Sequence, residues 1–168
     1  MFPHLTVLEN VIIGSHRRTH AGFFASAFWL PSARKEEKWS ADEAMAALSF
    51  VGLYDRAFHL ATGLPLGEEK LVELARALVM DPDMLLLDEP AAGLNDAETE
   101  NLASLLLRLR QKGRTVLIVE HNMNLVMSVS DRIVVLNYGH KIADGSPQEI
   151  QNDAAVIAAY LGGVAVPC

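Results

Sequence analysis

The chain has 168 residues, 51% of them hydrophobic and 21% charged, which is typical of a globular domain and not of a disordered chain. Its net charge of -7 argues against a nucleic-acid-binding protein, because such proteins carry a basic face. No secretory signal is recognisable, and the most apolar stretch, residues 21–31, is shorter than the roughly 20 residues that span a bilayer. We therefore expect a domain that is soluble or that reaches a membrane through a partner.

The first part of the chain, residues 1–62, is predicted to be a helical subdomain section. Thr6 and Glu9 have the spacing of a capping box, so LTVLENVIIG is expected to open a helix. Basic, aromatic and charged patches follow over residues 15–40 without a clear period. Two interpretations of this segment are open: a surface-exposed helical insertion with a few anchoring aromatics, or a docking surface for another subunit. Ser40 and Glu43 form a second capping box, which predicts a new helix at that point.

From residue 63 to residue 168 the pattern alternates regularly between helix and strand. The predicted helices are EEKLVELARALVM (68–80), a segment from Asn95 to about Gln111, NMNLVMSVS, and a C-terminal helix opened by Ser146-Pro147-Gln148-Glu149. The predicted strands are MLLLD, RTVLIVEH, DRIVVLN and HKIADG, the last reached through a turn at Tyr138-Gly139. Such alternation predicts an α/β fold with a mainly parallel sheet flanked by helices and closed by a β-hairpin. The continuously apolar MLLLD is expected to be buried on both faces.

Acidic residues follow two of the predicted parallel strands. Asp88 and Glu89 end the first, and Glu120-His121 end the next. Because ligands of parallel sheets lie outside the carboxyl ends of the strands, we expect these groups to share one crevice. Magnesium prefers carboxylate, water and phosphate oxygens, and phosphate chemistry needs a residue that orients water. Asp88 is then a candidate to hold the ion through water, Glu89 to polarise the attacking water, and His121 to sense a terminal phosphate.

LLLDEP, preceded by MDPDM, resembles the Walker B segment of ATP-binding cassette (ABC) ATPases, which have the P-loop NTPase fold. The resemblance continues in order along the chain. LPLGEEKLVELARAL is similar to the signature segment and its helix, AAGLN to the D-loop, VLIVEHNM to the switch histidine, and NYGHKIADGSPQEI to the closing hairpin and helix. Within this family the C-terminal part, together with FPHLTVLENVIIG, looks most like the ATPase subunits of branched-chain amino acid importers.

The resemblance implies ATP and Mg²⁺ as cofactors and assigns roles to individual residues. Asp88 would bind Mg²⁺ through water, Glu89 would be the general base, and His121 would contact the γ-phosphate. The signature residues, which would touch the ATP of a partner protomer, are Leu64, Pro65, Leu66, Gly67 and Glu68. The D-loop residues at the dimer interface would be Ala92, Gly93, Leu94 and Asn95.

The partners that the resemblance implies are a second ATPase subunit, identical or not, and transmembrane permease subunits. These would hold the protein on the cytoplasmic, inner face of the cell membrane, with residues 14–60 near the docking surface. The transported substrate is not readable from this sequence. Taken singly, each feature also has a simpler interpretation: Asp88-Glu89 as a solvated strand end, His121 as a structural residue, and Asn95 as an ordinary helix cap.

Two departures from the family pattern concern phosphate binding. No GxxxxGK[ST] occurs in these residues, so we expect the chain to correspond to the C-terminal two-thirds of such an ATPase, with the phosphate loop in the part before it. The signature LSGGQ reads LPLGE here, so Pro65 removes a hydroxyl and a backbone donor, and Glu68 replaces a neutral amide. An acid beside a polyphosphate is repelled by about 1 kcal/mol or more per close pair.

Three function classes remain open at this point. The first is an importer ATPase of which the chain is a part, and the second is a non-catalytic remnant that docks on a permease or on a partner ATPase. A DNA-repair or translation type of ABC ATPase is the third, and the transporter-like C-terminal segment makes it the least favoured. Whether these residues alone bind or hydrolyse ATP stays open.

Overall fold

The computed structural model describes residues 1–15 and 31–161, with side chains placed at 1–15 and 35–160. Its contacts divide the chain into two compact units, Met1–Val119 and the part from Glu120 onward, each described by itself. The expected domain boundary between residues 62 and 63 stays a prediction. Much of the segment predicted as an insertion or docking surface, residues 16–30, lies outside the described residues. Among the described helices, none combines the length and the hydropathy needed to cross a bilayer.

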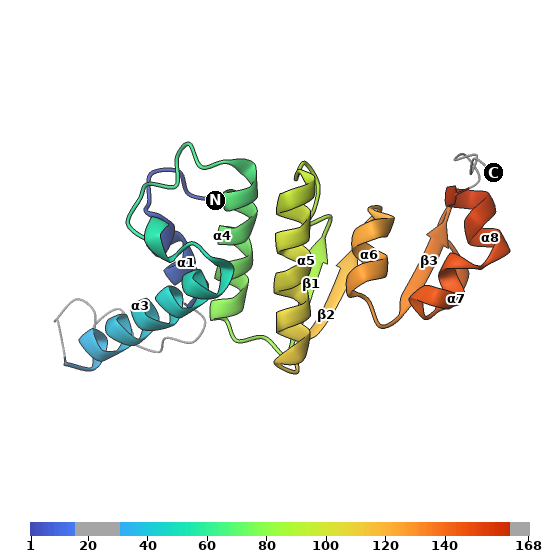
Figure 1. Ribbon diagram of the computed structural model, residues 1–168. Helices are drawn as coiled ribbons and strands as arrows, with labels where there is room; N and C mark the ends of the chain where they lie inside the picture. The colour runs from blue at the N-terminus through green and yellow to red at the C-terminus, as the bar shows by residue number, and fades with distance from the viewer. Residues whose placement is uncertain (16–30, 162–168) are drawn as a thin grey trace. The chain divides into compact units, whose positions relative to one another are not determined.

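Helices dominate the first half of the first unit. They are α1 (Val7–Ser15), α3 (Pro31–Val51), the 3-10 turn η1 (Tyr54–Arg56) and α4 (Leu66–Val79). Helices α1 and α3 pack on α4 and on each other (Figure 1). The predicted capping box of α1 is confirmed, since the Thr6 N–H donates to Glu9 Oε2 at 2.7 Å and the Glu9 N–H donates to Thr6 Oγ1 at 3.2 Å. The helices approach closely at Gly14, where an added Cβ would lie 2.2 Å from the carbonyl oxygen of Arg76.

The second predicted capping box is wrong. Helix α3 begins at Pro31 and runs through Ser40, which is buried in its interior with a hydroxyl that has no hydrogen-bond partner among the described residues. The physical reason lies upstream: proline is favoured in the first helical turn, and the ARKEEKW that follows consists mostly of good helix formers. The helix therefore starts nine residues before the Ser-x-x-Glu pattern that suggested its beginning.

A buried asparagine joins α1 to α4. Asn10 is fully buried, and its side chain accepts from Arg76 Nη2 at 3.0 Å and from the Phe2 N–H at 2.9 Å. Its Nδ2 donates to the carbonyls of Phe2 and Thr6, each at 2.9 Å. Arg76 also donates from Nε to the Asn10 carbonyl at 3.0 Å, so the guanidinium binds both ends of this residue. These bonds fix the N-terminal loop, α1 and α4 as one body.

The second half of the first unit holds a parallel strand pair with one helix. Strand β1 (Met84–Asp88), α5 (Asp96–Gln111) and β2 (Thr115–Val119) follow in order, and β1 pairs with β2 in the register Leu86↔Leu117. This confirms the two parallel strands that the sequence predicts. Burial on both faces is not confirmed, because Leu85 is buried whereas Leu86 is 67% exposed among the described residues. On the partner strand, Leu117 and Val119 are exposed in the same way.

The second unit is a hairpin packed against short helices. It contains α6 (Met123–Val129), β3 (Ile133–Asn137), β4 (His140–Gly145), α7 (Pro147–Gln151), α8 (Ala154–Val156) and the π-turn η2 (Ile157–Leu161). Strands β3 and β4 are antiparallel, as predicted, and their buried side packs Ile133 and Val135 on Ile150 and Val156. Helix α7 opens at Ser146-Pro147-Gln148-Glu149 as predicted, and Ser146 and Glu149 form a capping box there.

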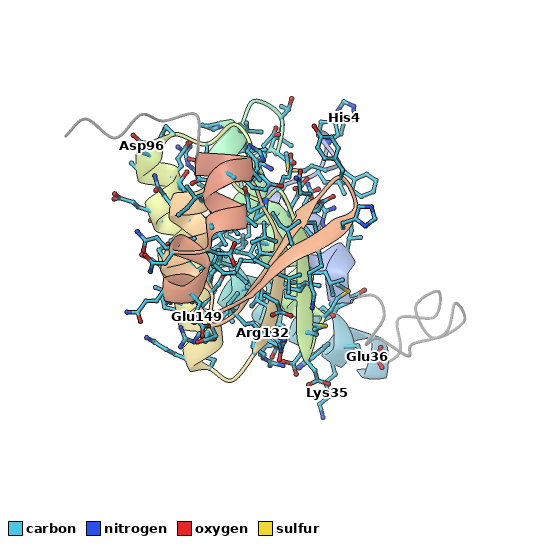
Figure 2. All side chains as sticks on the ribbon, turned by 90° about the vertical axis from the view of Figure 1, so that its right-hand side faces the viewer. His4, Lys35, Glu36, Asp96, Arg132 and Glu149 are labelled. Atoms are coloured by element: carbon cyan, nitrogen blue, oxygen red, sulfur yellow. The ribbon has the colours of Figure 1, made fainter. Side chains whose placement is uncertain are left out.

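The hairpin carries a charge cluster that makes its stability depend on pH. Asp144 on β4 accepts from Arg132 Nε at 2.8 Å and from Lys141 Nζ at 3.1 Å (Arg132 is labelled in Figure 2). These hydrogen bonds, that of Arg132 first, lower the pKa of the Asp144 carboxyl from 3.8 to about 2. Because the pKa is depressed in the folded state, the ionised carboxylate stabilises the hairpin above about pH 4, and this contribution is lost as the pH falls from about 4 to about 2.

We therefore expect Asp144→Asn to reduce the loss of structure that the second unit undergoes in acid. The amide chemical shifts of β3 and β4, followed by NMR from pH 7 to pH 2, should show partial loss of native signals in the original chain between about pH 4 and 2. In the variant the native population should be lower at pH 7 and should fall less in that interval, the remaining loss coming from Glu149, whose pKa is also lowered by its hydrogen bonds to Ser146. An unchanged acid step in Asp144→Asn would assign it to another carboxyl.

Candidate functional site

The two acids at the end of β1, Asp88 and Glu89, differ in backbone conformation. Asp88 is the last residue of β1 and pairs with Val119 of β2. Glu89 has φ +43°, in the left-handed region that residues other than glycine seldom adopt. Its N–H donates to the Val119 carbonyl at 2.9 Å, and its own carbonyl accepts from the Ala92 N–H at 3.1 Å. The chain thus leaves the sheet in a tight turn at Glu89.

This turn changes how the pair of acids is arranged. Alternation along an extended strand would send Asp88 and Glu89 to opposite faces, but the alternation stops at Asp88 because Glu89 no longer has strand geometry. A left-handed non-glycine residue costs about 1 to 2 kcal/mol. Strain of this size at one residue is a common feature of functional sites.

The structure brings the predicted signature segment next to the predicted D-loop. An added Cβ at Gly67, in the first turn of α4, would lie 2.4 Å from Glu98 Oε1 of α5. An added Cβ at Gly93 would lie 2.7 Å from Leu66 Cδ2, and Gly93 has φ +78°. Both glycines therefore permit a close approach that a side chain would obstruct. Leu64–Glu68 and Ala92–Asn95 lie on adjoining segments at the start of α4 and α5.

Asn95 caps helix α5. Its Oδ1 accepts from the Glu98 N–H at 2.9 Å, and Glu98 Oε2 accepts from the Asn95 N–H at 3.0 Å. The simpler interpretation of this residue, a helix cap, is thus confirmed, and a role at a dimer interface stays a prediction. The Glu98 side chain also lies close to Gly67, so the cap of α5 is next to the signature segment.

We expect Asn95→Ala to lower the free energy of unfolding by about 1 kcal/mol, because the first turn of α5 loses its side-chain acceptor. Urea unfolding followed by circular dichroism measures this change. Asn124→Ala, on the exposed side of the short helix α6, is the matched control and should change the free energy by less than about 0.5 kcal/mol. Equal effects of the two substitutions would contradict the capping role.

The acid at the end of the signature segment has a basic neighbour that sequence reasoning missed. Glu68 Oε1 lies 3.6 Å from Arg56 Nη2 of η1, and the Glu68 side chain is 24% exposed. Its Oε2 is buried without a hydrogen-bond partner among the described residues. The charge that Glu68 presents at the start of α4 is therefore partly offset by Arg56. Pro65 has no side-chain acceptor, so the N-cap residue satisfies none of the first backbone N–H groups of α4.

Glu120 and His121 follow β2 directly and belong to the second unit. The N–H groups of His121 and Asn122 donate to Glu120 Oε2 at 3.2 and 3.3 Å, and Asn122 caps α6 by accepting from the Leu125 N–H. Their expected convergence with Asp88 and Glu89 stays a prediction, because the two units are not placed relative to one another.

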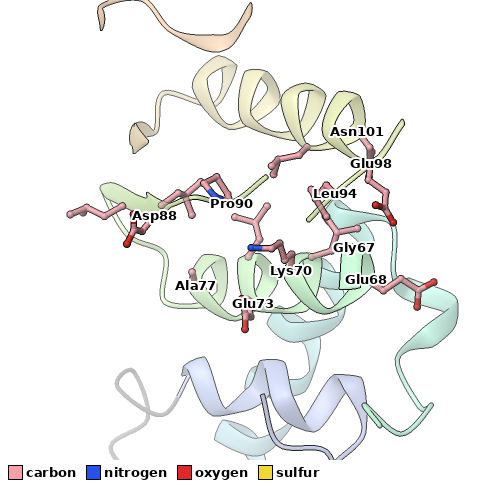
Figure 3. A pocket seen from close by; sticks show the side chains of 15 residues that line it. Gly67, Glu68, Lys70, Glu73, Ala77, Asp88, Pro90, Leu94, Glu98 and Asn101 are labelled. Carbon is pink, nitrogen blue, oxygen red and sulfur yellow. The ribbon is translucent and has the colours of Figure 1, made fainter. Parts of the chain in front are cut away.

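A pocket of about 340 Å³ lies beside the Asp88-Glu89 turn, between α4, β1 and the start of α5 (Figure 3). Leucines and methylene groups form most of its wall. Its polar positions are Glu68, Lys70, Glu73, Asp88, Glu98 and Asn101. Within the described ranges no three His, Cys, Asp or Glu side chains gather as a metal-binding group. A single carboxylate such as Asp88 still suits Mg²⁺, which keeps several waters and takes other ligands from a substrate phosphate.

Comparison with known proteins agrees with this geometry. Residues 1–92 match the family model described as ABC transporter, and residues 140–166 match that of the branched-chain amino acid ATP-binding cassette transporter. The structure resembles the ADP conformation of MJ1267, an ATP-binding cassette of an ABC transporter, with a TM-score of 0.77 and 32% identity over 95% of this chain and 64% of that one. A nucleotide-free ATP-binding cassette aligns with a TM-score of 0.76 and 31% identity, over 94% of this chain and 63% of that one.

The fold is that of the ATP-binding cassettes of the P-loop NTPase class. The chain belongs to the ABC transporter family. It is 41% identical, over 96% of its length, to the high-affinity branched-chain amino acid transport ATP-binding protein LivG of Escherichia coli and 42% identical to BraF of Pseudomonas aeruginosa. The chain spans 64% of the length of each of these curated relatives.

Proposed function

We propose that this chain is part of the ATP-binding and ATP-hydrolysing subunit of an importer of branched-chain amino acids. The main observation that supports this proposal is the turn after β1. There the strand-end carboxylate of Asp88 is followed by Glu89, whose left-handed conformation is held by hydrogen bonds. The names of the relatives, which describe ATP-binding proteins of branched-chain amino acid transport, support the choice of substrate class.

In this proposal each residue of the turn has one task. Asp88 holds Mg²⁺ through a water molecule, and Glu89 accepts a proton from the water that attacks the terminal phosphate. Bound Mg²⁺ neutralises the charge on the phosphate oxygens. His121 contacts the γ-phosphate from the segment after β2. The phosphate loop is not among these 168 residues, so the proposal concerns the part of the site that this chain contributes.

The start of α4 is proposed to bind the phosphates held by a second ATPase subunit. Its backbone N–H groups have no side-chain cap, and a helix N-terminus of this kind attracts anions. Residues 64–68 and the D-loop, residues 92–95, would then face that subunit. Two transmembrane permease subunits complete the assembly and hold it at the inner face of the membrane.

A second candidate function is a non-catalytic module that docks on a permease or a partner ATPase. The first turn of α4 favours it, because Glu68 and Glu69 place two carboxylates where a polyphosphate would lie. Arg56 lies near only one of them, Glu68.

A hybrid protein separates the two candidates. The segment of E. coli LivG that this chain matches is replaced by the chain, and the hybrid is produced in a strain that lacks LivG. An importer ATPase restores leucine uptake. A docking module assembles with the membrane subunits, as co-purification would detect, but leaves uptake at the level of the strain without LivG.

A further inference from the structure

A lysine on α4 contacts the backbone of the turn after β1. Lys70 Nζ donates to the Glu89 carbonyl oxygen at 3.2 Å, although the two residues are 19 positions apart in the sequence. The same oxygen accepts from the Ala92 N–H at 3.1 Å, and the Glu89 N–H donates to the Val119 carbonyl at 2.9 Å. Two neighbouring elements, α4 and β2, therefore hold the backbone of Glu89 from its two sides.

The contact is exposed, but it falls on a residue whose backbone conformation is strained. A non-glycine residue at φ +43° persists only where the surrounding structure fixes it. Lys70 is half-buried, and its side chain lines the pocket between α4 and the Asp88-Pro90 segment (Figure 3). This hydrogen bond is exposed, but a charged donor on a carbonyl forms a stronger hydrogen bond than a neutral one.

We propose that Lys70 is a positioning residue that holds Glu89 in its left-handed turn and so orients the carboxylate for proton transfer. This inference rests on the proposed function, in which Glu89 is the general base. Lys70 lies one turn after Leu66 and Gly67, at the start of the same helix. The contact therefore ties the turn of the base to the helix that would meet the nucleotide of the partner subunit.

Amide hydrogen exchange of the full 168-residue chain, measured by NMR, tests the structural part. In Lys70→Met we expect the Ala92 amide, which shares the Glu89 carbonyl, to exchange about tenfold faster, while amides in the middle of α4 and β1 keep their rates. Methionine has a helix propensity close to that of lysine, so α4 itself is not weakened. Lys70→Arg should restore slow exchange, because its guanidinium can donate to the same oxygen.

Lys38→Met, at an exposed position of α3, is the matched control and should leave the Ala92 rate unchanged. An unchanged Ala92 rate in Lys70→Met overturns the proposal. Faster exchange throughout α4 and β1 also overturns it, since Lys70 would then be a general stabilising residue.

Kinetics of the LivG hybrid provide a second and separate readout. There we expect Lys70→Met to lower kcat about tenfold with KM for ATP nearly unchanged, and Lys70→Arg to recover most of the loss. A hybrid that assembles but never hydrolyses ATP contradicts the proposed function, whereas the exchange rates still decide whether Lys70 holds the turn. Unchanged kcat in Lys70→Met, in a hybrid that does hydrolyse ATP, overturns the positioning role.

Discussion

Glu89→Gln in the LivG hybrid is expected to lower ATP hydrolysis by about 100-fold or more. The substitution keeps the size and shape of the side chain but removes the carboxylate that would accept the proton of the attacking water, and general bases contribute about 10²- to 10⁴-fold. Phosphate release by the purified hybrid transporter in vesicles, at saturating ATP and Mg²⁺, measures the effect. Nucleotide binding should persist, because glutamine removes a negative charge from the neighbourhood of the phosphates.

Glu100→Gln is the matched control for this experiment. Glu100 is exposed on α5, outside the turn and outside the lining of the pocket, and the same change of charge there should alter the rate by less than about twofold. If the two substitutions lower hydrolysis equally, or if Glu89→Gln leaves the rate unchanged, Glu89 is not the base.

Asn10→Ala is expected to destabilise the first unit by about 3 kcal/mol. The substitution leaves Arg76 Nη2 and the N–H of Phe2 without their side-chain acceptor. It also removes the bonds that Nδ2 donates to the carbonyls of Phe2 and Thr6, although these carbonyls still accept from the backbone N–H groups of Leu5 and of residue 10. Unpaired buried polar groups cost about 1 to 3 kcal/mol each, and a charged group costs more, although water that enters the gap reduces the sum. Urea unfolding measures the change as a lower midpoint at an unchanged slope.

Asn101→Ala, on the exposed side of α5, is its control and should change stability by less than about 0.5 kcal/mol. Asn10→Asp supplies a further test, because it keeps an acceptor for Arg76 but loses the two donated bonds, so an intermediate loss is expected. A loss below about 1 kcal/mol in Asn10→Ala would mean that these hydrogen bonds do not fix α1 on α4.

Features that depend on neighbouring residues in the sequence could be predicted. The capping box of α1 uses residues three positions apart, so its spacing alone identifies it. The start of α7 follows from Ser146-Pro147-Gln148-Glu149, with proline at the first helical position. The parallel strands β1 and β2 follow from apolar runs bounded by polar residues, and the hairpin follows from Tyr138-Gly139. The strand-end acids were also found from the sequence, because Asp88 and Glu89 interrupt an apolar segment.

Features that depend on distant residues could not be predicted. The Lys70–Glu89 contact spans 19 positions, and the Arg76–Asn10 bonds span 66. In the sequence of an amphipathic helix, a lysine or arginine that makes such a contact looks the same as one that is exposed to water. The left-handed conformation of Glu89 was missed for a related reason, since alternation along a strand assumes that the strand continues. Ser40 shows the opposite error. Ser40 and Glu43 have the spacing of a capping box, but the helix-forming residues before Ser40 place the start of α3 at Pro31.

If the turn at Asp88-Glu89 belongs to a working ATP site, the hybrid must hydrolyse ATP, so its hydrolysis rate is the decisive measurement. The measurement uses the purified hybrid, assembled with the membrane subunits of the LivG transporter in vesicles. We predict hydrolysis that requires Mg²⁺ and is at least about 100-fold above that of the Glu89→Gln hybrid. A hybrid that assembles and binds ATP, yet hydrolyses it no faster than its Glu89→Gln variant, would contradict this expectation and favour the docking module.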